Sequence, residues 1–235
     1  MRTIFLLLGL TFFMNINAQT STYNSLLKKY VDAKGNVNYK AFKTDEEKLQ
    51  TYLDELAATK PQKPWSAAKA KAFWANAYNA YTIKLVLDNY PLKSIMNIKK
   101  NGKNAWEIPF AKVGGKTYTL NQIEHEILRK KYNDPKIHVA VNCASGSCPK
   151  LPNYAFTEDN YESKTTALMK KFVNDTSRNK ISEKRLQLSK IFEWFQGDFT
   201  KEGSLIDFLN QYSDVKINKK AKISYLEYDW SLNGK

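Results

Sequence analysis

Hydrophobic residues recur with a helical period through much of the chain. Between Tyr23 and Tyr30 they follow the i, i+3, i+4, i+7 spacing of an amphipathic helix. Apolar residues at helical spacing and helix-start signals predict further helices over residues 49–56, 67–89, 158–174, 190–195 and 205–212. The longest begins after Ser66, a favourable N-cap residue, and ends before Pro91, which cannot continue a helix. The chain is therefore predicted to be rich in helix.

Three pairs of residues have the spacing of a capping box, in which two side chains pair with the free backbone N–H groups at a helix start. They are Thr44 with Glu47, Asn121 with Glu124, and Ser204 with Asp207. Each pair predicts the beginning of a helix. The second would begin a short helix that carries His125.

Short runs with a two-residue alternation predict a few strands. Residues 111–113 and 116–118 flank Gly114-Gly115, a pattern typical of a hairpin. Residues 136–142, 186–188 and 222–228 are further strand candidates. No Gly/Ser-rich linker and no internal repeat interrupts the chain. We therefore expect one α+β domain over residues 19–235, helix-rich, with a small and mostly antiparallel sheet.

The first 18 residues have the features of a secretory signal peptide. Arg2 precedes an apolar run over residues 4–13, and Ala18 ends a segment that resembles a cleavage site. The run is too short to cross a bilayer, and no later stretch reaches the roughly 18 apolar residues that a membrane helix needs. We expect an exported protein, periplasmic or extracellular, without a transmembrane segment in the mature chain.

Composition and charge narrow the expected partners. The 235 residues are 43% hydrophobic, which favours a packed globule, and carry a formal net charge of +14. For an exported protein this charge favours anionic envelope polymers or lipid headgroups as partners rather than nucleic acid. The alternative is that lysine-rich helix faces only keep the protein soluble. The sequence does not indicate an oligomeric state.

The segment from His138 to Pro149 contains both cysteines and one of the two histidines of the chain. Cys143 and Cys148 are close enough in sequence to form a disulfide in an exported protein. Alternatively, His138 activates one of them as a thiolate nucleophile. A metal site formed with both histidines, and buried structural thiols, are the remaining interpretations. The sequence alone leaves all four open.

In the catalytic interpretation, Cys148 is slightly preferred over Cys143 as nucleophile, and His138 is the base. If residues 136–142 form a strand, His138 shares its polar face with Asn142, while the intervening valines face the core. Asp229, at the end of the last predicted strand, is the candidate that orients His138.

Several polar and aromatic residues are candidates for binding. Asn76 and Asn79 lie three residues apart on the longest predicted helix, surrounded by aromatic residues. Buried amides must be hydrogen-bonded, so the two asparagines either anchor a backbone segment or contact a ligand. Asn142, His125 and Trp230 are the other candidates. No dinucleotide fingerprint, Walker A loop, H-E-x-x-H or G-x-S-x-G motif occurs, so no cofactor or metal ion is predicted.

Five motifs together resemble domain-of-unknown-function family 547. In chain order they span residues 74–79, 123–129, 138–149, 188–195 and 228–233. The resemblance extends from about residue 25 to the C-terminus. It implies a domain that occurs both in exported bacterial proteins and inside eukaryotic cells, with no settled activity. Members inside cells argue against an obligatory disulfide, because there the same loop carries reduced thiols.

The order of a long helix followed by a histidine-bearing strand is also faintly similar to papain-like and transglutaminase-like enzymes, by analogy only. Those enzymes place the nucleophilic cysteine before the histidine, whereas no cysteine precedes Cys143 here. Two hypotheses therefore remain. The first is a binding or structural module of the cell envelope with a pocket at the His138 strand and the cysteine loop, and the second is a cysteine-dependent hydrolase or acyl transferase.

Overall fold

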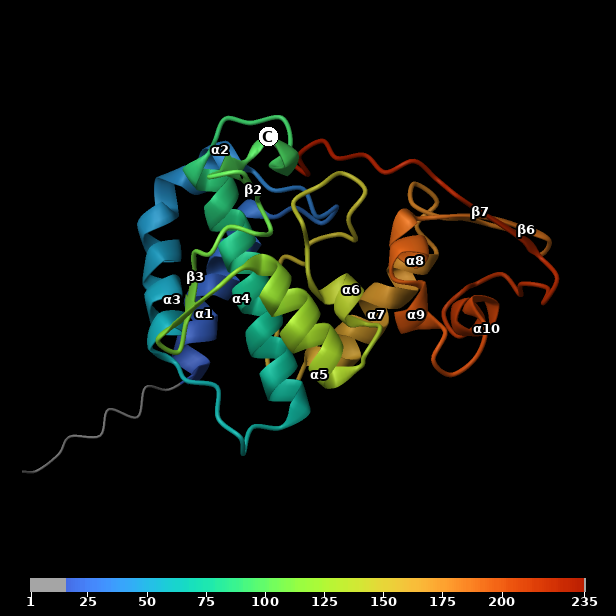
Figure 1. The fold of residues 1–235 in the computed structure, drawn as a ribbon, viewed down its shortest axis with the longest axis horizontal. Helices are drawn as coiled ribbons and strands as arrows, with labels where there is room; N and C mark the ends of the chain where they lie inside the picture. The colour runs from blue at the N-terminus through green and yellow to red at the C-terminus, as the bar shows by residue number, and fades with distance from the viewer. Residues whose placement is uncertain (1–15, 235) are drawn as a thin grey trace, which may run out of the picture.

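The computed structural model describes residues 16–234, and nearly half of this length is helical (Figure 1). The longer helices carry the bulk of the fold. They are α1 (Ile16–Tyr30), α3 (Glu46–Ala58), α4 (Ala67–Asp88), η3 (Gln122–Arg129), α7 (Tyr161–Val173) and α10 (Leu205–Asn210). Shorter helical segments connect them: α2 (Tyr39–Phe42), η1 (Lys43–Asp45), η2 (Ile95–Asn97), α5 (Lys130–Tyr132), α6 (Ile137–Ala140), α8 (Lys190–Trp194) and α9 (Gln196–Phe199).

The strands are short and form three separate small sheets. They are β1 (Lys99–Lys100), β2 (Lys103–Asn104), β3 (Ala111–Val113), β4 (Lys116–Tyr118), β5 (Lys180–Ile181), β6 (Arg185–Leu188) and β7 (Lys222–Tyr225). The pairs β1–β2, β3–β4 and β5–β6 are antiparallel, and only β7 runs parallel to its neighbour β6. The predicted helix-rich α+β class with a mostly antiparallel sheet is confirmed.

Several predicted elements agree closely with the structure. The longest predicted helix is α4, and the side chain of Ser66 caps it by accepting a hydrogen bond from the Lys69 N–H. The hairpin around Gly114-Gly115 is β3–β4, with Val113 opposite Lys116. Both glycines have positive φ, the backbone conformation that such a tight turn requires.

Only one of the three predicted capping boxes forms. Ser204 and Asp207 make both reciprocal hydrogen bonds at the start of α10. Thr44 instead donates its hydroxyl to the carbonyl of Ala41. At the third site the reciprocal bonds are made two residues earlier, between Thr119 and Gln122. Because this pair caps the segment, Glu124 is not used as a capping residue.

The strand predicted over residues 136–142 is wrong, because Ile137–Ala140 form the short helix α6. The Val141 N–H donates to the Ile137 carbonyl at 3.0 Å, as in an α-helical turn. All four residues of α6 are at most 3% exposed, so no polar face exists. A short apolar run that is buried on every side has the same pattern in a strand and in a helix, and periodicity does not separate the two.

The interior consists of two hydrophobic cores that meet at α6. The first core is built mainly by α1, α3 and α4, and the second by α7, β6, α8, α9 and α10. Ile137 and Ala140 belong to the first core, whereas Val139 belongs to the second. In Figure 1 the first core lies to the left of α6 and the second to the right. This junction positions the candidate site.

The predicted signal segment lies almost entirely outside the described residues. The backbone of α1 begins at Ile16, so a cleavage after Ala18 would fall within its first turn. Over residues 16–234, no helix has the length and apolar character needed to cross a membrane.

The segment after β7 returns from the second core to the first. Figure 1 shows it crossing the molecule to end near α2. On its way it contacts the cysteine loop, where the Asn233 N–H donates to the Ala144 carbonyl at 3.0 Å. Ser145 and Leu232 form an antiparallel bridge in the same place. Residues more than 80 positions apart thus form one wall of the candidate site.

Candidate functional site

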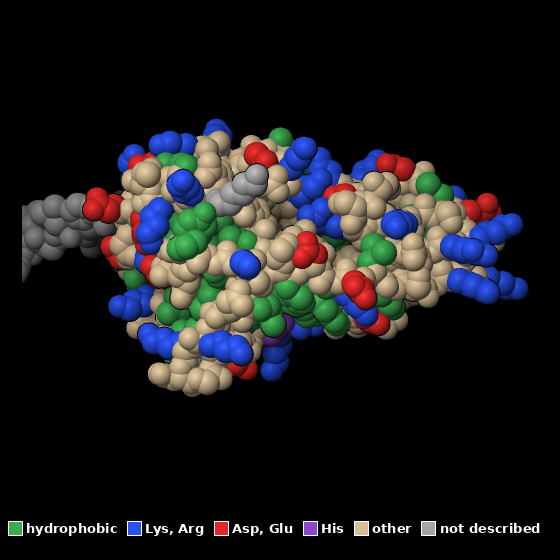
Figure 2. All heavy atoms as spheres, turned by 90° about the horizontal axis from the view of Figure 1, so that it is seen from above, with side chains coloured by type: hydrophobic (Ala, Val, Ile, Leu, Met, Phe, Trp, Pro, Cys, Tyr) green, Lys and Arg blue, Asp and Glu red, His purple; other side chains and the backbone are tan. Residues whose placement is uncertain are grey.

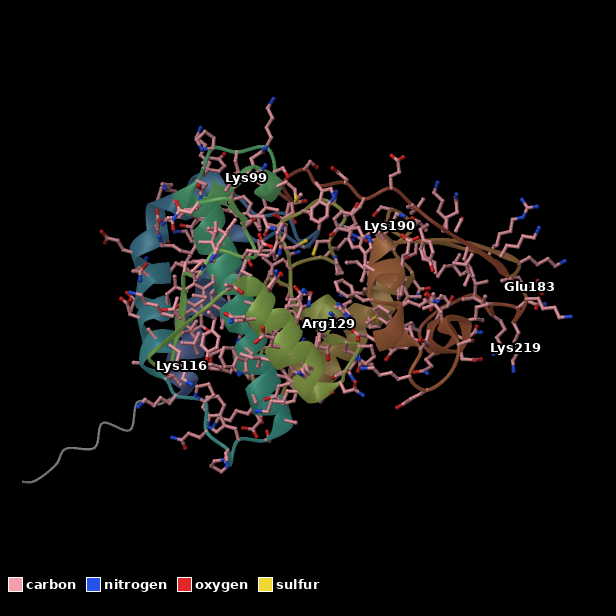
Figure 3. All side chains as sticks on the ribbon, in the orientation of Figure 1. Lys99, Lys116, Arg129, Glu183, Lys190 and Lys219 are labelled. Atoms are coloured by element: carbon pink, nitrogen blue, oxygen red, sulfur yellow. The ribbon has the colours of Figure 1, made fainter. Side chains whose placement is uncertain are left out.

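A cavity of about 200 Å³ lies where the two cores meet. The first core contributes Tyr78 from α4 and Glu124 from η3, and the second contributes Phe195. The other lining residues come from η3, α6, α8, the loops and the C-terminal segment: Trp106, Asn121, His125, His138, Val141, Cys143, Cys148, Ile191, Trp194, Tyr228 and Trp230. Arg129, labelled in Figure 3 in the middle of the molecule, contacts the lining residue His125. Both cysteines and both histidines of the chain therefore face one space.

Buried amides hold the cysteine loop to α4. The Asn79 Nδ2 donates to the Ala140 carbonyl at 2.8 Å, and the Asn142 N–H donates to the Asn79 Oδ1 at 2.8 Å. Asn142 in turn donates to the Pro149 carbonyl and accepts from the Ala144 N–H. Each group has a protein partner, so these amides fix the backbone before and after the cysteines.

The loop itself adopts an uncommon backbone conformation. Ala144, directly after Cys143, has a φ of 58°, in the left-handed region that residues with a Cβ seldom adopt. Two residues later, a Cβ on Gly146 would lie 2.6 Å from the Asp229 Oδ2, so a larger residue there requires the Asp229 side chain to move. Strained backbone of this kind persists where the surroundings enforce it, and it concentrates at functional sites.

The two thiols are adjacent but differ in environment. Both are free in the structure, Cys143 half-buried and Cys148 only 4% exposed. The Cys148 Sγ accepts a hydrogen bond from the Cys143 N–H at 3.2 Å. The Cys143 Sγ contacts the Ser145 hydroxyl at 3.0 Å and the Tyr228 hydroxyl at 3.4 Å. A disulfide between the cysteines stays a prediction.

These contacts separate the acidities of the two thiols. The hydrogen bond to the Cys148 side chain, supported by Ser145 and Tyr228 against the opposing effect of burial, lowers the pKa of Cys143 to about 7. Burial, together with the nearby Cys143, raises the pKa of Cys148 well above its usual value. Burial and the two cysteines likewise raise the pKa of Tyr228 far above its usual range, so Tyr228 stays a neutral donor.

His138 is held by an ion pair on the side of the second core. Its Nε2 lies 2.8 Å from the Asp198 Oδ2, which also accepts from the Arg129 Nε at 2.7 Å. Burial disfavours the charge of Asp198, but the hydrogen bonds from His138 and Arg129 outweigh it and hold the pKa of Asp198 well below its usual range. An ionised carboxylate only accepts, so the His138 Nε2 carries a proton and Nδ1 is the remaining basic position.

The imidazole of His138 is further fixed by aromatic packing. It stacks on Phe195, with ring centroids 4.3 Å apart, and lies 5.2 Å from the ring of Phe199. Arg129 covers the Phe195 ring at 4.6 Å. A histidine that is 3% exposed and held on several sides has one orientation, which is the requirement for a positioned acid or base.

His125 faces the cavity from η3 and is coupled to the same ion pair. Its Nδ1 lies 3.1 Å from the Arg129 Nη1. A guanidinium only donates, so the His125 Nδ1 accepts, and in the neutral ring the proton lies on Nε2.

Asp229 does not orient His138; Asp198 does. The Asp229 carboxylate accepts from the Ser231 N–H at 2.8 Å and from the Ser231 hydroxyl at 2.8 Å. Its backbone N–H donates to the Ser147 hydroxyl. Asp229 is exposed and shapes the turn that packs against Gly146, rather than lining the cavity.

Glu124 enters the cavity from a π-helical segment. The N–H of Lys130 donates to the His125 carbonyl five residues earlier, which is the hydrogen-bond pattern of this rare helix type. The wider turn places Glu124 and His125, adjacent in sequence, both in the cavity wall. Glu124 is 8% exposed, and its carboxylate forms no hydrogen bond or ion pair with any residue over 16–234.

Residues 62–173 match the family model described as "Protein of unknown function, DUF547". This part of the chain belongs to the DUF547 family. No curated protein and no solved structure matches the chain. The similarity to papain-like and transglutaminase-like enzymes thus stays an analogy.

The DUF547 segment contains only part of the cavity. It includes Tyr78, Glu124, His138 and both cysteines, and three of the five motifs noted in the sequence. The other two motifs, residues 188–195 and 228–233, lie beyond the matched region but line the same cavity through Trp194, Phe195, Tyr228 and Trp230. The extension of the domain over residues 19–235 stays a prediction.

The structure brings together only some of the candidate residues. Cys143, Cys148, His138, His125 and Trp230 line one cavity. Asn76, Asn79 and Asn142 lie outside it and tether backbone. Asn76 bonds both the carbonyl and the N–H of Phe156, at 2.8 and 2.9 Å.

Sequence reasoning missed Asp198, Tyr228, Ser145 and Glu124. Glu124 had been assigned to a helix cap, and its place beside His125 was the only available signal. Nothing in the sequence near Asp198 connects it to a histidine 60 positions earlier. Over residues 16–234, no group of three or more His, Cys, Asp or Glu side chains is arranged to hold a metal ion.

Proposed function

We propose that the cavity is the active site of a cysteine-dependent hydrolase or acyl transferase, with Cys143 as nucleophile and His138, oriented by Asp198, as acid and base. The observation that supports this proposal is that the half-buried sulfur of Cys143 and the imidazole of His138 line one cavity of about 200 Å³. A single substrate group in a space of that size contacts both.

The reaction requires two proton transfers. The Cys143 thiolate attacks a carbonyl carbon and forms a C–S bond, while the bond to the leaving group breaks and the leaving group takes a proton from His138. Water or another nucleophile then gives its proton to His138 and attacks the thioester. The C–S bond breaks, the acid or the transferred acyl product leaves, and the thiolate is restored.

The contacts favour Cys143 over Cys148, the residue slightly preferred from the sequence. Cys143 is the more exposed of the two and accepts hydrogen-bond support from Ser145 and Tyr228. Cys148 is buried and its pKa is raised, so it carries little of the reactive thiolate. In this proposal Cys148 supports the charge on Cys143.

Alkylation by iodoacetamide against pH tests the proposal. The reduced protein should lose one thiol rapidly, with a midpoint of about pH 7, and peptide mapping should locate the label on Cys143. The variant Cys143→Ser should lose this phase. The variant Cys148→Ala should retain it with a higher midpoint, because the hydrogen bond that acidifies Cys143 is gone. A thiol that reacts only near pH 9, or a label on Cys148, contradicts the proposal.

Trapping an acyl group separates chemistry from simple reactivity. With a p-nitrophenyl ester of a short acid, the intact mass should increase by one acyl group on Cys143. The variant His138→Gln should accumulate much less of it while Cys148→Ala still forms it. Failure of the unmutated protein to acylate with any ester, amide or thioester of a panel argues for a binding module instead.

A second candidate function, binding of anionic envelope polymers or lipid headgroups, is favoured by the surface of the second core. Seven exposed cationic side chains there form no ion pair with residues 16–234: Lys180, Lys184, Arg185, Lys216, Lys219, Lys220 and Lys222. Figure 2 shows lysine and arginine side chains gathered at the end of this part, where Figure 3 labels Lys219.

Salt dependence tests this second candidate. Phosphatidylglycerol vesicles and a soluble anionic polysaccharide should each be titrated between 50 and 300 mM salt, about a sixfold change over which electrostatic binding falls steeply. Replacement of three of the lysines by glutamine should abolish binding to the vesicles or the polysaccharide, whichever of the two the protein binds. Binding that ignores both salt and these lysines excludes the surface as the contact.

Export is part of the proposal and has its own test. The purified secreted protein should begin at Gln19, the residue after the predicted cleavage point. If Cys143 and Cys148 are bridged in the exporting compartment, the intact mass should be two hydrogens lower than after reduction. An N-terminus at Met1 in the recovered protein contradicts export through this segment.

A further inference from the structure

We propose that the cavity recognises a primary ammonium group, with Glu124 as its counter-ion and the rings of Trp106, Trp230 and Tyr228 as its wall. The inference deepens the proposed function and rests on it, because it names the substrate class of the same site. The amine would be either part of the acylated substrate or the group that accepts the acyl chain.

The first observation is the condition of Glu124. Its side chain belongs to a residue that is 92% buried, it lines the cavity, and no residue over 16–234 gives it a hydrogen bond or an ion pair. A carboxylate that lines a cavity without a protein partner is free to accept hydrogen bonds from a ligand. Arg129, five residues later in the chain, is already bonded to Asp198 and His125. A cationic ligand supplies the counter-ion that no protein side chain provides for Glu124.

The second observation is the aromatic wall. Trp230 contacts Trp106 with ring centroids 5.8 Å apart, and Tyr228 at 4.5 Å. Trp194, which is 46% exposed, lies against Tyr228 and Trp230 and forms the rim. The Nε1 of Trp106 donates to the Tyr78 hydroxyl, which fixes that ring. Clustered indole and phenol rings attract cations through the negative faces of their π-systems.

The third observation is the distribution of charge. The chain has 37 lysine and arginine residues, yet none lines this cavity. Glu124, Cys143 and Cys148 all act on Tyr78, and all three raise its pKa in addition to the larger effect of burial. Three groups that are negative when ionised therefore face one small space that no lysine or arginine lines. The cavity is therefore a local site for positive charge in an otherwise strongly basic protein.

The chemistry favours a primary ammonium over a quaternary one. A carboxylate accepts hydrogen bonds, and a primary ammonium offers three donors whereas a quaternary one offers none. The cavity of about 200 Å³ suits one side-chain-sized group rather than a large ligand. An alkylammonium of three to five carbons, such as the end of a lysine side chain, fits these requirements.

As an acyl acceptor, the amine would complete the proposed reaction. The ammonium gives a proton to the solvent and a second one to His138 as its nitrogen attacks the thioester carbonyl. A C–N bond forms, the C–S bond breaks, and the Cys143 thiolate leaves. The product is an amide.

Binding is tested in Cys143→Ser protein, in which no thiol chemistry occurs. Tryptophan fluorescence is titrated with n-butylammonium chloride at constant ionic strength, with n-butanol as the neutral analogue and tetramethylammonium as the cation without donors. We expect n-butylammonium to bind about tenfold or more tightly than either analogue, as expected for a charge-assisted hydrogen bond. The variant Glu124→Gln should remove this preference.

Glu126→Gln is the matched control, because Glu126 lies on the same helical segment but is exposed. This variant should bind n-butylammonium like its parent. If Glu124→Gln fails to fold, protection in the unmutated protein replaces it: n-butylammonium should slow alkylation of Cys143, and n-butanol at the same concentration should not.

The outcomes separate this inference from the proposed function. Equal binding of n-butylammonium and n-butanol, or an undiminished preference in Glu124→Gln, overturns the ammonium site even if Cys143 acylates normally. Selective ammonium binding in a protein whose Cys143 never acylates supports the site and overturns the proposed catalysis.

Discussion

The two cores contribute to the cavity in different ways. The first core fixes its part through neutral hydrogen bonds: Asn79 and Asn142 hold the backbone around the cysteines, and each of the four bonds involved is 2.8 to 2.9 Å long. The second core fixes its part through charge, since Asp198 holds His138 and Arg129. One wall of the cavity is rigid because its amides are satisfied, and the other because its charges are paired.

This difference teaches how the site divides its tasks. The nucleophilic sulfur belongs to the amide-tethered part, and its hydroxyl partners there, Ser145 and Tyr228, are neutral. The imidazole of His138 lies on α6, between the two cores. Its hydrogen bond to Asp198 connects it to the second core. A shift of one core relative to the other would change the position of His138 against Asp198 before it changed the cysteine loop.

The largest effect is expected from Asn79→Ala. It removes two buried hydrogen bonds and leaves the Ala140 carbonyl and the Asn142 N–H unpaired, so the free energy of unfolding should fall by about 3 kcal/mol. Asn76→Ala is the matched control on the same helix, because it also frees two backbone groups, those of Phe156.

Urea unfolding and iodoacetamide kinetics should be measured on both variants. Similar losses of stability are expected, but only Asn79→Ala should change the alkylation of Cys143, since only Asn79 tethers the cysteine loop. If Asn76→Ala changes Cys143 as strongly, the tether is not specific to this loop.

Asp198→Asn should cost about 2 kcal/mol, because it weakens the hydrogen bonds that a charged acceptor makes to His138 and Arg129. Asp214→Asn, in the exposed pair with Lys170, is the control and should cost almost nothing.

The effect of Asp198 also has a defined pH dependence. The folded-state pKa of Asp198 lies below its unfolded value of about 4, so its contribution is fully present above that value and is lost as pH falls towards the folded pKa. Thermal melts should therefore show a constant difference between the unmutated protein and Asp198→Asn from pH 5 upwards, about one unit above the unfolded value, and a shrinking difference below pH 4. A difference that grows on acidification contradicts the ion pair.

Ser204→Ala tests how much the capping box at the start of α10 stabilises the second core. The variant removes the only capping box that forms of the three predicted, and should lower the free energy of unfolding by about 1 kcal/mol. Thr44→Ala, at the predicted box that does not form, should cost less because the Thr44 hydroxyl caps no helix and bonds the Ala41 carbonyl, with a longer contact to the Tyr30 hydroxyl. Equal losses, measured by urea unfolding, would show that the reciprocal bonds at Ser204 add nothing.

Tyr228→Phe should have the smallest effect on stability, below about 1 kcal/mol, because the ring packing remains. Its consequence lies in the thiol: without the hydroxyl at 3.4 Å, the alkylation midpoint of Cys143 should rise by about half a pH unit. Tyr225→Phe, on the same segment but remote from the cysteines, serves as the control. An unchanged midpoint in Tyr228→Phe means that this hydroxyl bonds Ser145 alone.

Elements that face a single core are predicted well from the sequence. Helix α4 appears where Ser66 and Pro91 bound it, and the hairpin β3–β4 appears where Gly114-Gly115 predicts a tight turn. Helix α6 fails this rule, since it is buried by two cores at once and has no exposed face to reveal its period.

The candidate site was predictable only where its chemistry is local. Cys143, Cys148 and His138 lie within eleven residues of each other, and their common location follows from the sequence. Asp198 and Tyr228 reach them only through tertiary packing, across 60 and 85 positions. Glu124 was assigned to a cap because Thr119 and Gln122 were not recognised as the pair that takes that place.

The passage of residues 228–233 across the cysteine loop has a consequence for biosynthesis. Tyr228 follows Cys143 by 85 positions, so it leaves the ribosome, and in an exported protein crosses the membrane, after the cysteine loop. Until it arrives, Cys143 lacks a hydrogen-bond donor and the cavity lacks part of its aromatic wall. The Tyr228 contribution to the acidity of the thiol is therefore gained only after synthesis has passed this segment, whereas Cys148 and Ser145 are already part of the chain.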